Sequence, residues 1–356
     1  MLIFLRMEKF LKEIKIGIIG AGGIACSVHI PNYQKIENVH VIAVADIKPE
    51  VAENAANRFN ISNVFTAWED LLEIDEIEAV SVCTPNAFHA EPSIAAMKAN
   101  CHVLCEKPMA VNVTEAQAMT DAAKEHQRIL QIGLASRFSP GSLYLKNLID
   151  GGRLGQIYYG RAMAMRRRGI PSWGGFTRKD VSGGGTLFDI GVHAIDHVIW
   201  LMGAPKPVSV FGSAMTKFGD RHDVINPDWG VWDVDNFDVD DFAIGSVRFE
   251  NGAMLTIETS WASNIENVGG SYILGTDGGV HVVGDTVFEQ RNGKLANTLI
   301  ELPSGPGGHE TEVRYFIDAI RNGLPSPVDP EEVLNVQKIM NAVYQSTETG
   351  KSVDIS

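Results

Sequence analysis

Short, predominantly apolar runs alternate along the first third of the chain with segments whose apolar residues recur at helical spacing. The apolar runs predict strands buried on both faces, at residues 14–19, 39–45, 79–82, 102–105 and 129–132. The segments between them predict helices at residues 50–59, 68–72, 87–99 and 114–126. Strands and helices that alternate in this order predict an α/β fold, in which helices cover both faces of a doubly wound parallel sheet.

Beyond Gly133 the predicted strands are longer, and apolar and polar residues alternate along them. These strands are expected at residues 156–165, 207–215, 240–249 and 253–261. The last two are joined by Glu250-Asn251-Gly252, a turn typical of antiparallel hairpins. Helices are predicted at residues 184–202, 311–321 and 330–347. The second half of the chain therefore has the pattern of an α+β domain with a large, mostly antiparallel sheet.

Length and charge set the number of domains and the class of partner. The 356 residues suit two domains, which the change of pattern places at residues 1–134 and 135–356. The formal net charge of −14 argues against nucleic acid and anionic membrane surfaces, because binding to phosphates requires clustered Lys and Arg. No apolar stretch approaches the length of a membrane span. Small neutral or polar ligands suit this composition better.

The N-terminus and the cysteines favour a cytoplasmic protein. The apolar run at residues 2–5 is too short for a secretion signal, and Met7 is an alternative start. The four cysteines, Cys26, Cys83, Cys101 and Cys105, have no metal-ligand spacing, and the last three lie in or beside apolar strands. Such cysteines are typical of buried, reduced thiols.

A glycine-rich segment, Gly20-Ala21-Gly22-Gly23-Ile24-Ala25, follows the first predicted strand and opens a helix. Gly20 permits a tight turn, Gly22 lets the backbone approach a pyrophosphate, and Ala25 stands where a third glycine would allow close helix packing. Phosphates would lie at the helix N-terminus, where free N–H groups and the helix dipole favour anions. The same pattern also describes an ordinary tight turn. The strand before it and the helix after it favour a dinucleotide site at Gly20, Gly22, Gly23 and Ile24.

Asp46 ends the second predicted strand, about 20 residues beyond the glycines, where an acidic residue commonly binds the adenosine ribose. A carboxylate repels a 2′-phosphate, so Asp46 favours NAD over NADP. Lys48 is close enough in sequence to leave NADP open. The alternative role of Asp46 is to cap the helix that begins near Pro49.

Polar residues also follow two other predicted strands. Thr84-Pro85-Asn86 ends one strand, with His89 one helical turn beyond, and Glu106-Lys107-Pro108 ends the next. Because ligands bind at the carboxyl edge of a doubly wound sheet, we predict that these residues line the cofactor site: Thr84, Pro85, Asn86, His89, Glu106 and Lys107. Most lysines are ordinary surface residues, but the strand before Lys107 and the proline after it favour a catalytic role. Pro108 is a candidate for a cis peptide bond.

Gly183-Gly184-Gly185 precedes a predicted helix that carries Asp189, His193 and His197. Their spacing of four residues places all three along one side of that helix. His193 is the candidate for proton transfer, because an acid lies one turn earlier and the glycines favour an accessible end. His197 is expected to be structural. The same three residues could instead bind a divalent metal, but hydride transfer needs none and we predict none.

In these motifs the chain resembles the Gfo/Idh/MocA oxidoreductases, which include glucose-fructose oxidoreductase and inositol dehydrogenase. The resemblance covers nearly the whole chain and rests on the glycine turn and on residues 84–89, 106–108, 183–196 and 319–353. It implies a Rossmann domain and a catalytic trio that falls on Lys107, Asp189 and His193. It also implies an open-faced sheet in the second domain that commonly makes an oligomer interface, in a homodimer or homotetramer.

The implied reaction is hydride transfer between the nicotinamide and a secondary alcohol of a sugar, glycoside or cyclitol. We expect His193 to take the hydroxyl proton, Lys107 to hydrogen-bond the same oxygen, and Asp189 to orient His193 or another hydroxyl. The pH profile should then show an acid limb at a pKa of about 6–7.5. Arg168 and Trp173 are candidates for sugar contacts, since Arg binds hydroxyls and Trp stacks on a sugar face. The arginine run at residues 166–168 also fits a solvated strand end.

The Asp-rich segment at residues 220–241 carries Trp229 and Trp232 and is predicted as a solvated loop or as a lid that covers a sugar. Two other functions are compatible with the motifs: an NAD-dependent glycosidase that oxidises its substrate transiently, and a catalytically silent NAD-binding sensor. A sensor has no need of the catalytic trio, which favours an enzyme. No motif identifies the sugar or the direction of the reaction.

Overall fold

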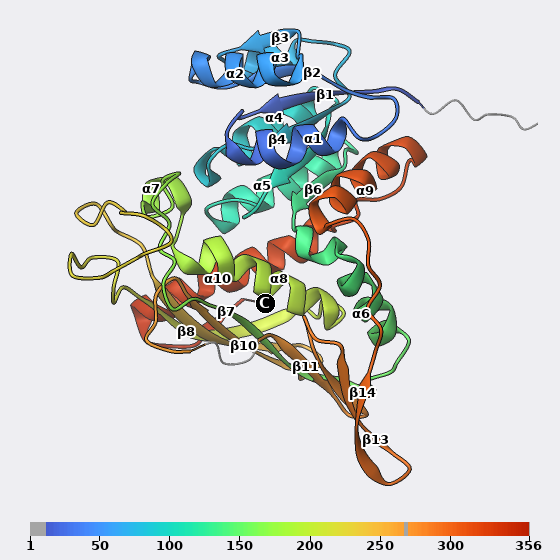
Figure 1. Cartoon of the computed structure of the whole chain (residues 1–356), viewed down its shortest axis with the longest axis vertical. Coiled ribbons are helices and arrows are strands. Elements are labelled where there is room, and N and C mark those ends of the chain that lie inside the picture. The colour runs from blue at the N-terminus through green and yellow to red at the C-terminus, as the bar shows by residue number, and fades with distance from the viewer. Residues whose placement is uncertain (1–11, 267–269, 356) are drawn as a thin grey trace, which may run out of the picture.

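The computed structural model describes residues 12–266 and 270–355, so the run at residues 2–5 and Met7 lie outside the described residues. Two sheets form the molecule, the smaller one above the larger in Figure 1. The smaller sheet has six parallel strands in the order β3-β2-β1-β4-β5-β6, which confirms the predicted doubly wound fold. Its strands are β1 (Ile14–Ile19), β2 (Val39–Ala45), β3 (Asn63–Phe65), β4 (Ala79–Val82), β5 (His102–Glu106) and β6 (Leu130–Gly133).

Alternate residues of the central strands enter two separate apolar cores, which explains why these strands are predominantly apolar on both faces. Val80 and Val82 belong to one core, and Ile16 and Ile18 belong to the other. The helices of this part are α1 (Ile30–Tyr33), α2 (Pro49–Phe59), α3 (Trp68–Leu72), α4 (Ala90–Lys98) and α5 (Val113–Glu125). A π turn, η1 (Ala25–His29), precedes α1, and a 3₁₀ turn, η2 (Asn86–Phe88), precedes α4.

The larger sheet has nine strands in the order β14-β13-β12-β11-β7-β10-β9-β8-β15. Neighbouring strands are antiparallel except β7 and β10, which confirms the predicted mostly antiparallel sheet. The strands are β7 (Ile157–Met165), β8 (Pro207–Met215), β9 (Phe242–Phe249), β10 (Met254–Ser260), β11 (Tyr272–Gly275), β12 (Gly278–His281), β13 (Thr286–Arg291), β14 (Lys294–Leu299) and β15 (Val353–Asp354).

The sequence pattern does not predict strands β11 to β14. β11 and β12 have four residues each and contain Gly275, Gly278 and Gly279. β13 and β14 form a hairpin whose residues are mostly exposed, and Figure 1 shows it extending away from the rest of the sheet. Short strands with glycines, and strands exposed on both sides, lack the apolar alternation from which a strand is predicted.

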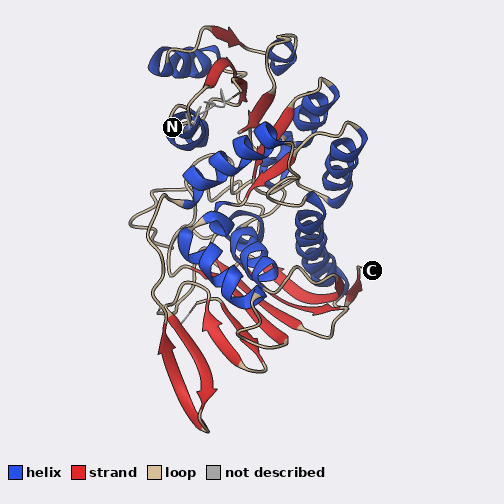
Figure 2. Cartoon of the chain, turned by 90° about the vertical axis from the view of Figure 1, so that its right-hand side faces the viewer, coloured by secondary structure: helices blue, strands red, loops and turns tan. Residues whose placement is uncertain are grey.

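Helices lie against one face of the larger sheet, as Figure 2 shows. Helix α8 packs on β7, and α10 packs on β8. The helices of this part are α6 (Pro140–Asp150), α7 (Lys179–Ser182), α8 (Val192–Leu201), α9 (Gly308–Asn322) and α10 (Pro330–Thr349). The turns η3 (Ala135–Phe138) and η4 (Leu187–Gly191) precede α6 and α8, and η4 is a π turn.

Helix α9 brings the chain back to the first sheet. Val313, Phe316 and Ile317 of this helix share a core with Ile16 and Ile18 of β1. The boundary at residue 134 stays a prediction, and the two sheets are joined by more than the chain connection there. None of the helices in residues 12–266 and 270–355 has the length and apolarity needed to cross a membrane.

Candidate active site

The glycine turn after β1 packs tightly on one side and is open on the other. Gly20 has a φ of +88°, and a Cβ there would lie 2.8 Å from the backbone of Cys83 and Thr84. A Cβ on Gly22 or Gly23 would meet nothing within 4 Å. The turn therefore presents bare backbone at the start of a helix, the surface that a pyrophosphate requires.

Asp46 joins the end of β2 to this turn. Its Oδ2 accepts a hydrogen bond of 2.9 Å from Ala21 N, and its Oδ1 accepts one of 3.0 Å from Lys48 N. The N-cap of α2 is Lys48, so Asp46 is not the cap considered as its alternative role. The carboxylate lies beside the glycines, as a ribose ligand must.

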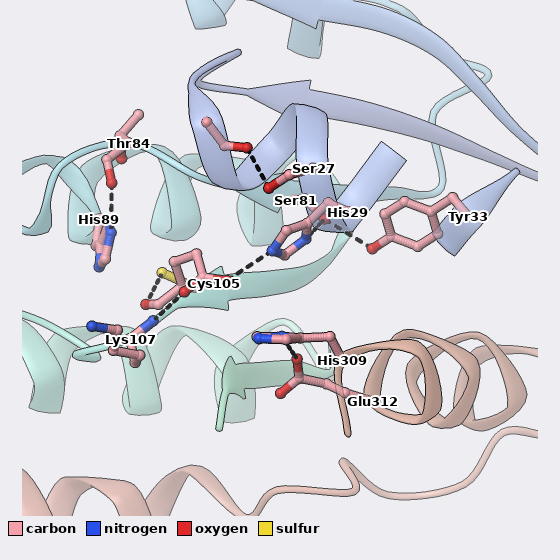
Figure 3. A network of polar contacts seen from close by, with 12 residues as sticks. Ser27, His29, Tyr33, Ser81, Thr84, His89, Cys105, Lys107, His309 and Glu312 are labelled. Carbon is pink, nitrogen blue, oxygen red and sulfur yellow. Dashed lines mark hydrogen bonds and ion pairs between the residues drawn. The ribbon is translucent and has the colours of Figure 1, made fainter. Parts of the chain in front are cut away.

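The ends of β4 and β5 are braced to each other and to the second half of the chain. His89 is buried, and its ring nitrogens lie 2.8 Å from Pro108 O and 2.9 Å from Thr84 O. Burial lowers the pKa of His89, although both carbonyls oppose the shift. Asn86 Nδ2 donates to Ser182 O at 2.9 Å. The His89 ring thus links the ends of the two strands, as its contact with Thr84 in Figure 3 shows. A direct contact between this ring and a cofactor stays a prediction.

Lys107 and Asp189 meet at the junction of the two parts of the chain. Lys107 Nζ donates to Asp189 O at 3.0 Å and to Asp189 Oδ1 at 3.1 Å. Trp261 Nε1 donates to the other carboxylate oxygen at 3.0 Å. The bond between Lys107 and Pro108 is cis, as expected. The side chains that bind the Asp189 carboxylate are therefore Lys107 and Trp261, and its predicted role in orienting His193 or another hydroxyl stays a prediction.

Burial and charge keep Asp189 ionised and His193 neutral. Burial raises the pKa of Asp189, but Lys107, Trp261 and Arg166 outweigh it and lower the pKa. Burial and the charge of Lys107 lower the pKa of His193 to about 3, against the opposing charges of Asp189 and Glu106. This pKa lies below the acid limb expected at about 6–7.5, because a desolvated imidazole beside a cation resists protonation. The pH profile itself stays a prediction.

A buried polar chain lies behind Lys107, shown in Figure 3. Glu106 Oε1 is 2.8 Å from His29 Nε2, and Glu106 Oε2 accepts from Lys107 N at 3.2 Å. His29 Nδ1 is 3.0 Å from Ser81 Oγ, which is 2.8 Å from the Tyr33 hydroxyl. Burial opposes ionisation of Glu106, but the bond and charge of His29 lower its pKa to about 2. Glu106, which the sequence predicts to line the cofactor site, is thus held by His29 of η1.

The local sequence explains how η4 presents Asp189. Asp240 Oδ1 accepts from Gly185 N at 2.8 Å, and Oδ2 accepts from Leu187 N at 3.2 Å. A Cβ on Gly185 would lie 1.8 Å from Asp240 O, so only glycine permits this approach. Asp240 and Trp261 were missed from the sequence. The only sequence signal for Asp240 was its place in the acid-rich segment at residues 220–241.

The predicted sugar-contact residues differ in how firmly other residues of the protein hold them. Arg168 donates to Ser263 O at 3.1 Å and to Asn264 Oδ1 at 3.0 Å, which ties it to the loop after β10. Trp173 is 56% exposed and stays a candidate for a sugar contact. Trp232 is only 6% exposed and donates to Gly219 O at 2.7 Å, so it is a core residue and not a sugar cover.

The base of the segment at residues 220–241 is also fixed. Asp241 accepts hydrogen bonds from three backbone N–H groups, of Lys217, Phe218 and Gly219. Whether its tip moves as a lid stays a prediction.

The remaining residues of the histidine helix have structural partners. Asp196 accepts a bidentate pair from Arg137 at 2.9 and 2.6 Å, and both side chains are buried. His197 stacks on Trp200. Within the described residues, no group of three or more His, Cys, Asp and Glu side chains is arranged to hold a metal ion.

Comparison with known proteins agrees with this geometry. Two models of one oxidoreductase family match the chain: the NAD-binding Rossmann fold over residues 14–134 and the C-terminal alpha/beta domain over residues 146–355. The chain is 32% identical over 344 residues to D-glucoside 3-dehydrogenase from Escherichia coli strain K12. This alignment covers 96% of this chain and 97% of that enzyme.

Levoglucosan dehydrogenase is similar in both sequence and structure. The enzyme from Pseudarthrobacter phenanthrenivorans is 28% identical over 295 residues, which cover 76% of this chain and 73% of that enzyme. A solved structure of levoglucosan dehydrogenase in complex with NADH and levoglucosan aligns with a TM-score of 0.83 at 25% identity, over 97% of this chain and 100% of that chain.

Proposed function

Because the chain belongs to the Gfo/Idh/MocA oxidoreductase family, we propose that it is an NAD-dependent dehydrogenase acting on a secondary alcohol of a sugar, glycoside or cyclitol. The observation that carries this proposal is the contact between Lys107, at the end of β5, and Asp189, in η4. This contact joins the carboxyl edge of the six-stranded sheet to the turn η4 in the second half of the chain. Relatives named for a glucoside and for levoglucosan support a carbohydrate substrate.

The described residues fit NAD. The open backbone at Gly22 and Gly23 would hold the pyrophosphate, and Asp46 would accept hydrogen bonds from the adenosine ribose. We propose that Gly20, Ile24 and the residues Thr84, Pro85 and Asn86 complete this surface. When bound, the nicotinamide supplies the acceptor or donor of the hydride. Asp46 disfavours a 2′-phosphate, which supports NAD over NADP.

Lys107 and His193 would act on the substrate oxygen. An ammonium group has three N–H donors, and Asp189 faces two of them, so the third is available for a substrate oxygen. The low pKa of His193 keeps its ring neutral at physiological pH, so the ring can accept the hydroxyl proton. Lys107 would then stabilise the negative charge that develops on that oxygen. Asp189 holds the Lys107 side chain in place, and Trp261 in turn holds Asp189.

The proposal is tested with a panel of glucosides, aldoses, anhydrosugars and cyclitols, each assayed for NADH absorbance with NAD. We expect NADH to form with at least one of them. Release of free sugar from a glycoside without added cofactor would instead identify a transiently oxidising glycosidase. Tight NAD binding with no turnover of any compound would favour the sensor.

We also propose a homodimer or homotetramer that forms through the larger sheet. The face of this sheet away from α8 and α10 carries exposed apolar side chains, including Phe211, Ile244 and Met254. An apolar face of this kind favours contact with a second copy. The four free cysteines, three of them buried, support a place in the reducing cytoplasm.

A further inference from the structure

Two tryptophans from separate loops form an exposed stack. The ring centroids of Trp173 and Trp229 are 5.5 Å apart, and the ring planes differ by 6°. Trp173 is 56% exposed, although side chains of this size are usually well buried. Stacking therefore fixes the orientation of Trp173 while much of its ring stays in contact with solvent.

The two loops that carry this Trp stack are pinned together beneath it. Asn226 is 8% exposed, and its Nδ2 donates to Ile170 O at 2.8 Å and to Gly230 O at 3.0 Å. Its Oδ1 accepts from Ile170 N at 3.3 Å, and the Ile170 side chain is fully buried. The Trp stack is thus preorganised, and a ligand that binds to it need not order the loops first.

Arg166 connects the Trp stack to the catalytic groups. Its guanidinium lies 4.3 Å from the ring centroid of Trp229. Its positive charge acts on the Asp189 carboxylate, which is the partner of Lys107. A Cβ on Gly169 would lie 2.6 Å from Arg166 Cδ and 3.3 Å from the Trp229 ring, so the glycine makes room for this contact. The row of side chains therefore starts beside Asp189 and ends at the exposed Trp173.

We propose that the Trp173–Trp229 stack is a subsite for the second ring of a glycoside. The substrate is then a disaccharide or a glycoside with a cyclic aglycone, and not a free monosaccharide. This inference rests on the proposed function, because the oxidised ring must reach Lys107 and His193. A second ring attached to it can extend along the row to Trp173. The flat indole face suits the C–H face of a sugar ring or the plane of an aromatic aglycone.

The test compares one-ring and two-ring substrates. The sugar that the panel identifies is used as its methyl glycoside, its phenyl glycoside and a disaccharide with the same anomeric configuration. The wild type should have a kcat/KM about tenfold higher for the two-ring compounds than for the methyl glycoside. Trp173→Ala should remove this preference, mainly through KM, by lowering kcat/KM for the two-ring compounds about tenfold more than for the methyl glycoside.

Matched variants separate stacking from folding. Trp173→Phe keeps an aromatic ring and should keep most of the preference. Tyr144→Ala removes an exposed aromatic ring from α6, away from both loops, and should behave as the wild type. A preference for the phenyl compound alone would assign an aromatic aglycone, and a preference for the disaccharide alone would assign a sugar.

A second readout does not depend on turnover. Calorimetric titration in the presence of NADH should show that Trp173→Ala weakens binding of the two-ring glycoside about tenfold and binding of the methyl glycoside little. Equal effects on both ligands, or none on either, would overturn the subsite while leaving the dehydrogenase intact. If the wild type oxidises no compound in the panel, the proposed function fails, and the titration, carried out with methyl and phenyl glucoside, still decides whether the stack binds a second ring.

Discussion

At the scale of single residues, Lys107 lies between two buried carboxylates, and each of them has a further partner. Glu106 accepts from Lys107 N and lies 2.8 Å from His29, while Asp189 binds Lys107 Nζ and Trp261. Removal of the ammonium would therefore leave the Asp189 carboxylate with the Trp261 hydrogen bond and the charge of Arg166. The first consequence should be loss of the charge that faces the substrate oxygen.

Lys107→Met is expected to lower turnover by about a hundredfold or more, because it removes the hydrogen bond to the developing oxyanion. NAD affinity should change little, since the glycine turn and Asp46 are untouched. Steady-state kinetics and NAD titration measure the two effects separately. Lys146→Met, in a surface ion pair on α6, is the control and should leave both unchanged. Lost NAD binding with normal turnover of bound enzyme would contradict the assignment.

His193→Asn tests the proton acceptor. Since burial and Lys107 lower the pKa of His193 to about 3, the wild-type ring is neutral above that pH. The kcat/KM for alcohol oxidation should therefore show no acid limb from His193 between about pH 6 and 8, and the variant should be slower by about a hundred- to ten-thousandfold throughout. His197→Asn should affect mainly stability. If the wild type shows an acid limb near pH 6.5 that the variant lacks, the environment of His193 in the working enzyme differs from this structure.

The metal alternative has its own test. EDTA should leave wild-type activity unchanged. Loss of activity that zinc or manganese restores would make the face with Asp189 and His193 a metal site.

Asp46→Ser should weaken the preference for NAD. The carboxylate beside the glycine turn repels a 2′-phosphate, so the wild type should have a higher kcat/KM with NAD than with NADP. The variant should narrow this ratio by about tenfold or more, because one carboxylate contact is worth about 1.4 kcal/mol or more here. Equal values for the wild type would show that Lys48 or another cation dominates.

At the scale of elements, the two side chains that bind Glu106 and Lys107 at the carboxyl end of β5 both come from π turns. His29 ends η1, and Asp189 lies in η4. π turns have i→i+5 hydrogen bonds and occur often at functional sites. The sequence pattern assumes 3.6 residues per turn, so it aligns Asp189 with His193 but does not predict that the carboxylate turns toward Lys107.

The elements that the sequence predicts are those with an uninterrupted period. The predicted parallel strands have apolar residues at most positions, the predicted long helices have them at every turn, and all of these predicted elements are present. The Lys107 and glycine-turn positions follow from these strands, because their carboxyl ends share one sheet edge. Trp261 and Asp240 could not be predicted, because their roles depend on contacts with η4 across 72 and about 50 residues of sequence.

Helix α9 carries a buried carboxyl group whose charge should destabilise the folded state. Glu312 is fully buried, neither carboxylate oxygen has a hydrogen-bond partner, and His309 Nδ1 is 3.6 Å away. Burial raises its pKa from 4.5 to about 7, although His309 opposes the shift. The folded state thus holds the proton more tightly than the unfolded state. Stability contributed by Glu312 should therefore fall as the pH rises from 4.5 to 7.

Glu312→Gln should remove this pH dependence. At pH 8 we expect the variant to raise the free energy of unfolding by about 1–3 kcal/mol, and at pH 5 by clearly less. Urea denaturation at the two pH values measures the difference. Glu310→Gln, at a partly exposed carboxylate of the same helix that is ion-paired with Lys35, is the control and should show no gain at pH 8. The same change in stability at both pH values would mean that Glu312 does not titrate in this range.

At the scale of the whole molecule, the site depends on elements that cross between the two sheets. Helix α9 shares a core with β1, and Asn86 near β4 bonds to Ser182 of α7. These contacts hold Lys107 against Asp189 from both sides. The larger sheet packs against α8 and α10 through one face only. Its opposite face is left for another partner.

The last prediction concerns that opposite face. Phe211 and Ile244 lie on neighbouring strands and are 56% and 41% exposed, more than residues of a covered sheet. If two copies pack through this face, Phe211→Lys and Ile244→Lys each bury an unpaired cation at the interface, which costs several kcal/mol. Sedimentation velocity should then show a shift toward the monomer, while NAD affinity and the melting curve of the monomer stay close to the wild type. Leu324→Lys, equally exposed but beyond α9, should leave the oligomer intact. An unchanged mass for both sheet variants would place the interface on another surface, because a packed apolar face does not tolerate two different unpaired cations.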